Sequence, residues 1–122
     1  MKHQRENSPK AVGPYSQTVK ANGLVFCSGQ IGIDPTTNEI VVGIEAQTNR
    51  VLKNLRLILA DAGSGLNQVV KTTIYLVNMA DYAKVNEIYG QYFGKIKPAR
   101  ATVGVSSLPK GVLIELDAVA TF

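Results

Sequence analysis

The sequence predicts an α+β fold in which two helices pack on one face of a β-sheet. Two segments have the 3.6-residue apolar period of amphipathic helices, and segments rich in β-branched and aromatic residues lie before, between and after them. Their order, β-(β)-α-β-α-β-β, is typical of a layered α+β architecture. The chain has 122 residues and shows no repeat or linker, so we expect a single domain over residues 1–122, with residues 1–8 as a flexible tail.

The first strand is expected at residues 24–33, "LVFCSGQIGI". Alternation along this strand would place four side chains on one face: Leu24, Phe26, Ser28 and Gln30. Cys27 would point to the other face, where a free cysteine ordinarily serves as a small buried apolar side chain. Gly29 has no side chain, so another backbone or a ligand can approach it closely.

Both helices follow from the spacing of apolar residues. The first is expected from Ile44 to Ala62, with Gly63 as its left-handed stop. The second is expected to begin at about Asp81, a candidate N-cap, and to end at Gly94. Its inward side chains would be Tyr82, Val85, Tyr89, Tyr92 and Phe93.

Three further strands are expected at residues 67–78, 101–105 and 112–120, the last two joined by the turn "SSLPKG". The final strand carries apolar residues on both of its faces, including Val112 and Ile114 on one and Leu113 and Val119 on the other. Because two helices cover only one side of a sheet, we expect another copy of the chain to cover the other side in a closed assembly. Pockets are favoured at such interfaces.

Composition excludes several kinds of active site. Cys27 is the only cysteine and His3 the only histidine, so the chain lacks the residues for a CxxC site, a Ser-His-Asp triad or a histidine-ligated zinc site. The N-terminal "MKHQRENSPK" has no apolar core, and no later segment reaches 18 consecutive apolar residues. We therefore expect a cytoplasmic protein that does not enter a membrane.

A net charge of +4 raises the question of nucleic-acid binding. The basic residues are scattered, and only Arg50, Lys53 and Arg56 form a stripe at helical spacing. We interpret that stripe as the solvated face of the first helix, so nucleic acid is not expected as a partner.

Arg100 is the residue that most suggests a binding site. It directly follows Pro-Ala at the start of an apolar strand, and we expect Glu115 and Asp117 to face it from the neighbouring strand. A guanidinium matches a carboxylate through two parallel hydrogen bonds, so Arg100 is a candidate substrate clamp. An ion pair with Glu115 or Asp117 is the structural alternative.

The motifs "GPYSQTV", "FCSGQIGIDP", "VVKTTIYLVNMADYAKVNEIYGQYF" and "KPARATVGVSSLPKGVLIELDAVA" closely resemble the reactive intermediate deaminase family, also called Rid or YjgF-like proteins. The resemblance covers residues 9–122. It implies a chorismate-mutase-like fold, with a mixed sheet and two helices, and a homotrimer whose sheets face inward around three interface pockets. It also implies hydrolysis of reactive 2-imino acids, such as 2-iminobutanoate and 2-iminopropanoate, to 2-oxo acids and ammonia, without a cofactor.

The resemblance assigns a role to each matching position. Arg100 would bind the substrate carboxylate, and Glu115 would position or polarise the attacking water. The substrate pocket would be lined by Tyr15, Ser28, Gly29 and Asn86, together with Thr102. Many deaminase members read "RSCV" where this chain reads "RATV", so Thr102 stands in place of a cysteine. Burial would raise the pKa of Glu115 and Arg100 would lower it, and the sequence leaves that balance open.

Two other functions remain open. The same pocket would serve a non-catalytic module that binds small carboxylates for regulation. Cleavage of RNA or inhibition of translation is less favoured, because the chain lacks basic residues interleaved with aromatic ones and lacks a histidine general base.

Overall fold

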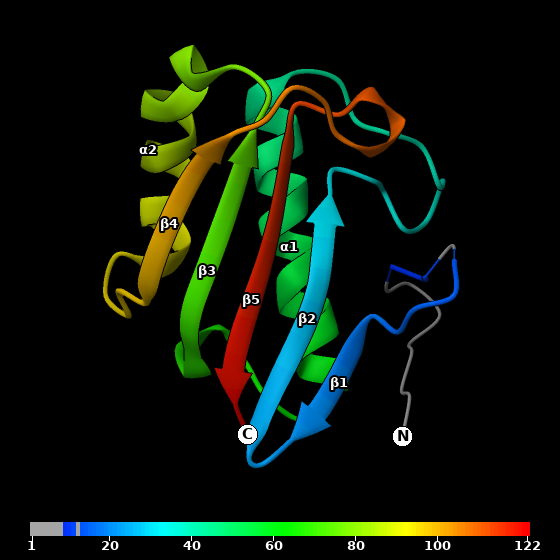
Figure 1. Cartoon of the computed structure of the whole chain (residues 1–122), viewed down its shortest axis with the longest axis vertical. Coiled ribbons are helices and arrows are strands. Elements are labelled where there is room, and N and C mark those ends of the chain that lie inside the picture. Colours follow the sequence, from blue (N-terminus) through cyan, green and yellow to red (C-terminus); the bar gives the residue numbers. More distant parts are fainter. Residues whose placement is uncertain (1–8, 12) are drawn as a thin grey trace.

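The computed structural model describes residues 9–11 and 13–122, and the tail expected at residues 1–8 lies outside that range together with His3. The helices and strands follow one another as β1 (Thr18–Ala21), β2 (Leu24–Ile31), α1 (Ile44–Asp61), β3 (Val69–Leu76), α2 (Tyr82–Phe93), β4 (Ala99–Gly104) and β5 (Ile114–Thr121). Both helices lie on the same side of the sheet (Figure 1). The α+β fold with two helices on one face is therefore confirmed.

The sheet is mixed and has the strand order β1-β2-β5-β3-β4. β3 and β4 are parallel, and every other neighbouring pair is antiparallel. The expectation that the last two strands are neighbours is wrong, because β3 lies between β4 and β5. Strand β4 instead joins β3 through α2, as a strand-helix-strand unit ordinarily does.

β1 and β2 form a hairpin closed by Asn22 and Gly23. Both turn residues have positive φ, 51° and 77° respectively. This is the conformation of a two-residue turn that matches the twist of paired strands, and Asn-Gly is its strongest sequence signal. The hairpin places a strand, β1, before the one that the sequence analysis expects as the first, at residues 24–33.

A bulge interrupts β2 between Cys27 and Gln30, where its register with β5 shifts. Val25 and Cys27 are buried before the bulge, and Gln30 is buried after it. The expectation that Gln30 shares a face with Ser28 is therefore wrong, because an extra residue inverts the alternation. Gly29 lies within this bulge.

α1 agrees closely with the sequence prediction, and Gly63 just beyond it has a φ of 79°. The start of α2 differs. Asp81 makes no side-chain capping bond, and the Asn78 side chain instead accepts from the Ala80 N–H at 3.0 Å. Tyr82 was expected to face inward but is 38% exposed.

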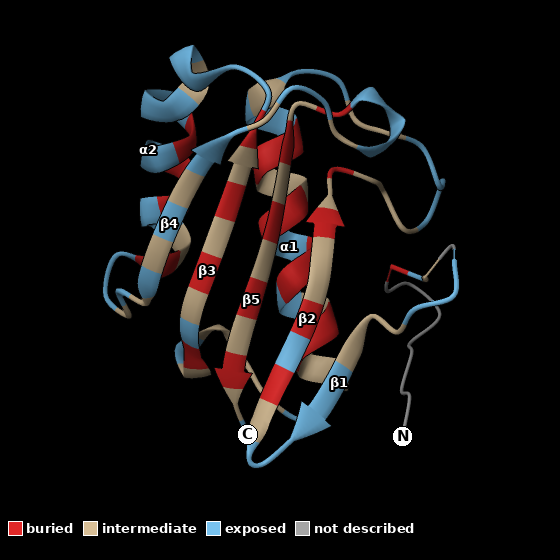
Figure 2. Ribbon diagram, viewed as in Figure 1, coloured by how far each residue is buried: buried red, intermediate tan, exposed pale blue. Residues whose placement is uncertain are grey.

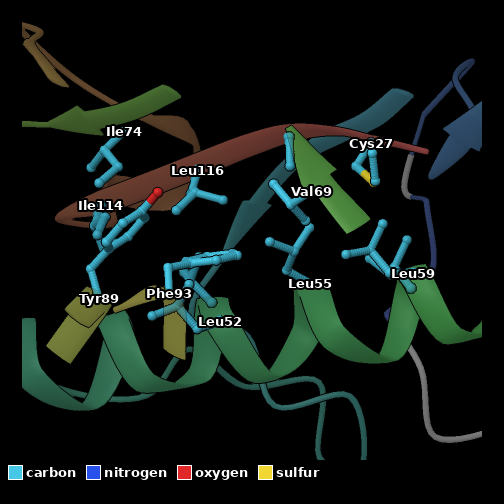
Figure 3. Close-up of a cluster of buried hydrophobic side chains, with 14 of the residues drawn as sticks. Cys27, Leu52, Leu55, Leu59, Val69, Ile74, Tyr89, Phe93, Ile114 and Leu116 are labelled. Atoms are coloured by element: carbon cyan, nitrogen blue, oxygen red, sulfur yellow. The ribbon is translucent and has the colours of Figure 1, made fainter. Parts of the chain in front are cut away.

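The core lies between the sheet and the two helices (Figure 3). Leu52, Leu55 and Leu59 of α1 and Phe93 of α2 contribute some of its fully buried side chains. Cys27 is also buried, as expected. Burial, and secondly the charge of Asp117, raises the pKa of its thiol to about 12. Such a thiol is protonated at neutral pH and is a poor nucleophile.

In the part of the chain that the structure describes, no helix covers the other face of the sheet (Figure 2). A row of apolar residues crosses it, because Phe26 pairs with Val19 on one side and with Val119 on the other. Val19 is 54% and Phe26 45% exposed. We call this row, Val19, Phe26 and Val119, the open-face row. Among residues 9–11 and 13–122, neither helix is long and apolar enough to cross a membrane.

Candidate functional site

Arg100 points from β4 toward α2. It pairs in register with Thr72, which is fully buried beneath the helices, so both side chains lie on the helix side of the sheet. One terminal nitrogen of the guanidinium, Nη1, donates to Asn86 Oδ1 at 2.8 Å, and the other, Nη2, donates to the Tyr82 hydroxyl at 2.8 Å. The guanidinium carbon lies 4.9 Å from the centre of the Tyr89 ring, within the range of a cation–π contact.

Helical spacing explains why α2 supplies these contacts. Tyr82, Asn86 and Tyr89 are separated by four and three residues, so they lie along one stripe of the helix. The Tyr89 hydroxyl shares a 2.7 Å hydrogen bond with Thr72 Oγ1, which fixes the ring beneath Arg100. Burial raises the pKa of Tyr89, although the Thr72 bond and the charge of Arg100 oppose this.

The charge of Arg100 has no carboxylate partner among the described residues, since both of its hydrogen-bond acceptors are neutral. The alternative of an ion pair with Glu115 or Asp117 is therefore wrong for the single chain. Beside the guanidinium lies an open cavity of about 410 Å³. It is lined by Asn86, Tyr89, Gly90, Phe93, Gly94, Lys97, Pro98 and Arg100.

Thr102 follows Arg100 by two positions on β4 and therefore lies on the same face. Its register partner, Ile74, is a core residue. The Thr102 Oγ1 atom is buried and has no hydrogen-bond partner within the described part of the chain. An unpaired buried hydroxyl is costly, so this position is suited to an additional hydrogen-bonding group.

Glu115 lies on the opposite, open face of the sheet. In β5 it pairs with Tyr75 of β3 and Ile31 of β2. Its carboxylate lies against the backbone of Gly29, where even one added methyl group would overlap it. Burial, and secondly the charge of Asp117, raises the pKa of Glu115 above its usual range.

Asp117 is held by a neighbouring strand rather than left as a simple exposed acid. The Tyr75 hydroxyl donates to Asp117 Oδ2 at 2.9 Å. This hydrogen bond is the main reason why the pKa of Tyr75 is raised. Asp117 therefore keeps a defined position beside Glu115.

Tyr15 and Ser28 lie on the β1–β2 side of Glu115. Tyr15 is 45% exposed and lines a small cavity of about 50 Å³ together with Gly29 and Lys110. The Ser28 hydroxyl donates to the Ser16 carbonyl, so its proton is already used within the chain. Its oxygen can still accept a hydrogen bond.

The predicted site residues thus form two groups in one chain. Arg100, Asn86 and Thr102 lie on the helix side at the β4 edge, whereas Glu115 and Gly29, with Tyr15 and Ser28 beside them, lie around the open face. The expectation that Glu115 faces Arg100 from the next strand is wrong within one chain, since β3 intervenes and the two side chains point to opposite faces. One group offers a cation with unused donors, and the other a carboxyl group that holds its proton more tightly than usual.

Sequence reasoning missed the two tyrosines that hold Arg100. Tyr82 and Tyr89 were both expected in the core, and only Tyr89 is buried. The available signal was the four-residue spacing of Tyr82 and Asn86, which places two hydrogen-bond acceptors on one helix stripe.

The basic stripe on α1 is separate from both groups. Arg50 donates to Asn54 at 3.0 Å, and Arg56 lies over the Tyr92 ring at 5.9 Å. Lys53 and Arg56 are exposed, in agreement with a solvated helix face. Within the described ranges, no group of three or more His, Cys, Asp or Glu residues is placed to hold a metal ion.

Comparison with known proteins matches residues 5–122 to the family described as Endoribonuclease L-PSP. A RutC family protein of Pyrococcus horikoshii is 57% identical over 116 residues, which are 94% of this chain and 92% of that protein. The chloroplastic Reactive Intermediate Deaminase A of Arabidopsis thaliana is 49% identical over 117 residues, 95% of this chain and 63% of that protein. The structure of Escherichia coli TdcF with bound serine has a TM-score of 0.94 at 34% identity, and the match covers 100% of this chain and 98% of TdcF.

Proposed function

This chain belongs to the Endoribonuclease L-PSP family, also called the Rid or YjgF-like family, and from that premise we propose that it hydrolyses reactive 2-imino acids to 2-oxo acids and ammonia. Membership supports deamination of reactive imine intermediates at the level of the family. The substrates proposed for this chain are 2-iminobutanoate and 2-iminopropanoate. The proposed location is the cytoplasm, and the proposed source of the imines is a pyridoxal-phosphate-dependent dehydratase, as the family resemblance implies.

The proposal rests on one observation, that Arg100 is held in place but has no carboxylate partner in the described part of the chain. Its guanidinium is fixed by Asn86 and Tyr82, and its charge is not neutralised by a carboxylate of the described chain. A guanidinium has five N–H donors, of which these bonds use two, so three remain for a ligand. A small 2-imino acid supplies the missing carboxylate. Serine, which carries a carboxylate of the same kind, is bound in the TdcF structure.

The reaction asks little of the protein beyond binding and orientation. The carbon of a protonated imine is already electrophilic, so water can attack it without an activated serine or cysteine. In the proposed step, water forms a bond to C2 while Glu115 accepts one of its protons. The resulting carbinolamine takes that proton on nitrogen from Glu115, and its C–N bond breaks to release ammonia while the hydroxyl gives its proton to Glu115 and becomes the carbonyl of the 2-oxo acid. A glutamate with a raised pKa suits both transfers, because it is a stronger base than an ordinary carboxylate and can still return the proton.

Both groups of residues are needed for this step, although they lie on opposite faces of one chain. We therefore place the complete site between two copies, with Arg100, Asn86 and Thr102 from one and Glu115 from the next. The open-face row supports such contact, because its large apolar side chains, Val19 and Phe26, are exposed in the described part of one chain. The assembly proposed is a homotrimer with three equivalent sites.

The remaining pocket residues are assigned by position. Tyr15 and Gly29 share a small cavity next to Glu115, and Ser28 offers an oxygen as acceptor. Thr102 offers the unpaired hydroxyl to the substrate or to the attacking water. We propose that these three residues and Thr102 select small aliphatic substrates.

A coupled dehydratase reaction tests the proposal. Purified protein is added to threonine dehydratase acting on threonine, with semicarbazide present to trap free imine, and the appearance of 2-oxobutanoate is followed. Wild type is expected to accelerate 2-oxobutanoate release in competition with the trap. Arg100→Ala is expected to lose at least about 100-fold in activity, because the charged bidentate contact is removed. Arg56→Ala, which removes an arginine from the outer face of α1, is the matched control and should remain active.

Arg100→Lys and a binding experiment separate the alternatives. A lysine keeps the charge without the planar fork, so full activity of Arg100→Lys would contradict bidentate recognition. If folded wild type does not accelerate release yet binds 2-oxobutanoate through Arg100, the protein is a non-catalytic module for small carboxylates.

The family description also names a ribonuclease activity, which makes RNA cleavage a second candidate. The basic stripe on α1 is the surface on which RNA would lie, and its members Lys53 and Arg56 are exposed. Incubation of the protein with labelled single-stranded RNA over a range of salt concentrations tests this candidate. Cleavage that is lost in a Lys53→Ala/Arg56→Ala variant would favour it, and stable RNA would rule it out.

A further inference from the structure

Tyr82 begins α2, and its hydroxyl is bonded to Arg100 instead of lying in the core. The residue is 38% exposed, and its hydroxyl accepts a 2.8 Å hydrogen bond from Arg100 Nη2. Its ring centre also lies 5.7 Å from the guanidinium carbon. The tyrosine therefore contacts Arg100 both through its hydroxyl and through its ring.

Two different acceptors hold the two ends of the guanidinium. Asn86 binds Nη1 and Tyr82 binds Nη2, while the Tyr89 ring supports the guanidinium at 4.9 Å. With only one acceptor the plane of the group could turn about the single bonds of the side chain, such as Cδ–Nε, and its two terminal nitrogens could exchange by rotation about the Cζ–Nε bond. With two acceptors on one helix, the plane of the guanidinium is defined before any ligand arrives.

The cavity beside Arg100 is not lined by Tyr82. Asn86, Tyr89 and Arg100 line it. Tyr82 therefore acts on Arg100 without being part of the cavity wall. Prior orientation of a binding group reduces the loss of side-chain freedom when a ligand binds.

We propose that Tyr82 is a positioning residue for Arg100, and that its hydroxyl fixes the guanidinium plane in which a substrate carboxylate is bound. This inference rests on the carboxylate-binding role of Arg100 proposed above and adds a residue to it. Tyr82 acts through Arg100, so its loss should weaken binding and leave the chemical step nearly unchanged.

The chain offers a matched pair of variants. Tyr82→Phe removes the hydroxyl that binds Arg100 and keeps the ring. Tyr92→Phe makes the same chemical change on the same helix, where the lost hydroxyl bonds to Asn49 at 3.3 Å and not to Arg100. Any effect specific to Tyr82→Phe is therefore due to Arg100 rather than to the loss of a phenol in general.

The first measurement needs no ligand. Nitrogen-15 NMR of the arginine side chains reports the rate of rotation about the Cζ–Nε bond of Arg100. The rate is expected to rise several-fold in Tyr82→Phe and to be unchanged in Tyr92→Phe. Equal rates in wild type and Tyr82→Phe would overturn the inference, whatever the activity of the protein.

The second measurement is of affinity and turnover. Tyr82→Phe is expected to raise the Kd for 2-oxobutanoate, and the KM in the coupled dehydratase reaction, by about three- to tenfold, with kcat changed less than about twofold. In an Arg100→Ala background, Tyr82→Phe should have no further effect on Kd. An unchanged Kd despite faster rotation, or a fall in kcat alone, would contradict a positioning role. Absence of turnover in wild type would refute the proposed function, while the NMR rates would still decide whether Tyr82 positions Arg100.

Discussion

Arg100 and Glu115 lie on opposite faces of the same sheet, and the strand β3 separates the two strands that carry them. Arg100 is bound by α2 on the helix side, and Glu115 lies against Gly29 on the open side. A reaction that uses both residues therefore requires a second copy of the chain.

Gly29 is predicted to set the position of Glu115. In Gly29→Ala the new methyl group would displace the carboxylate. Since a small misplacement of a catalytic group is costly, activity should fall about 10- to 100-fold. The displaced atoms are at the flexible end of a side chain, so the free energy of unfolding should fall by no more than about 1 kcal/mol. Kinetics and chemical denaturation measure the two effects.

A second substitution provides the control for Gly29. In a Glu115→Ala background the added methyl group meets no carboxylate, so Gly29→Ala should cost less stability there than in wild type. An equal loss of stability from Gly29→Ala in the two backgrounds would show that Gly29 is required for a reason other than the position of Glu115.

Thr102 is predicted to serve a ligand rather than the fold. Its hydroxyl is buried without a partner in the described chain, so Thr102→Val should change the free energy of unfolding by less than about 0.5 kcal/mol or increase it. Thr72→Val is the matched comparison on the adjacent strand, because its hydroxyl bonds to Tyr89 at 2.7 Å. That variant should lose about 1–2 kcal/mol. A large loss of stability in Thr102→Val would show that the hydroxyl has a structural partner.

The raised pKa of Glu115 predicts a dependence of stability on pH. Below its ordinary value of 4.5 the carboxyl is protonated in both the folded and unfolded protein. As pH rises from there through the raised pKa of the folded state, the unfolded state loses the proton first, so stability falls. Glu115→Gln removes this loss of stability, because glutamine does not titrate. The melting temperature of the Glu115→Gln variant should therefore exceed that of the Arg100→Ala protein in which it is made at neutral pH, and should match it at low pH.

The background for this pH experiment is Arg100→Ala, at one fixed protein concentration. A guanidinium from a second copy would lower the pKa of Glu115 in the folded state. With Arg100 restored, the range of pH over which the stability falls should therefore be narrower. A melting-temperature difference that does not vary with pH would contradict burial of the Glu115 carboxyl.

Elements that depend on local pattern were predictable from the sequence. The apolar period from Ile44 onward and the stop at Gly63 define α1 almost to the residue, because helical contacts are local. The two-sided apolar pattern of β5 predicted a sheet face without helices, and the open-face row is that face. The Asn22-Gly23 turn carried a signal of equal strength that places β1.

The arrangement of the site depended on long-range pairing. Strand order is set by which strands pair, and only the strand-helix-strand connection indicates that β4 lies beside β3 rather than beside β5. The face of Arg100 follows from its register with Thr72, and the face of Gln30 from a bulge that alternation cannot foresee. The residue types at the site were predictable, but their division between two faces was not.

Complementation between two inactive variants tests the central claim most directly. Arg100→Ala and Glu115→Gln are each expected to be inactive alone. If Arg100 of one copy works with Glu115 of the next in a trimer, assemblies that contain both variants should show about a third of wild-type activity, because each mixed trimer has both residues intact at one of its three sites. Co-expression with two different tags and assay of the doubly purified protein measures it. Activity no greater than that of either variant alone, in mixed assemblies shown to contain both, would contradict a site shared between copies.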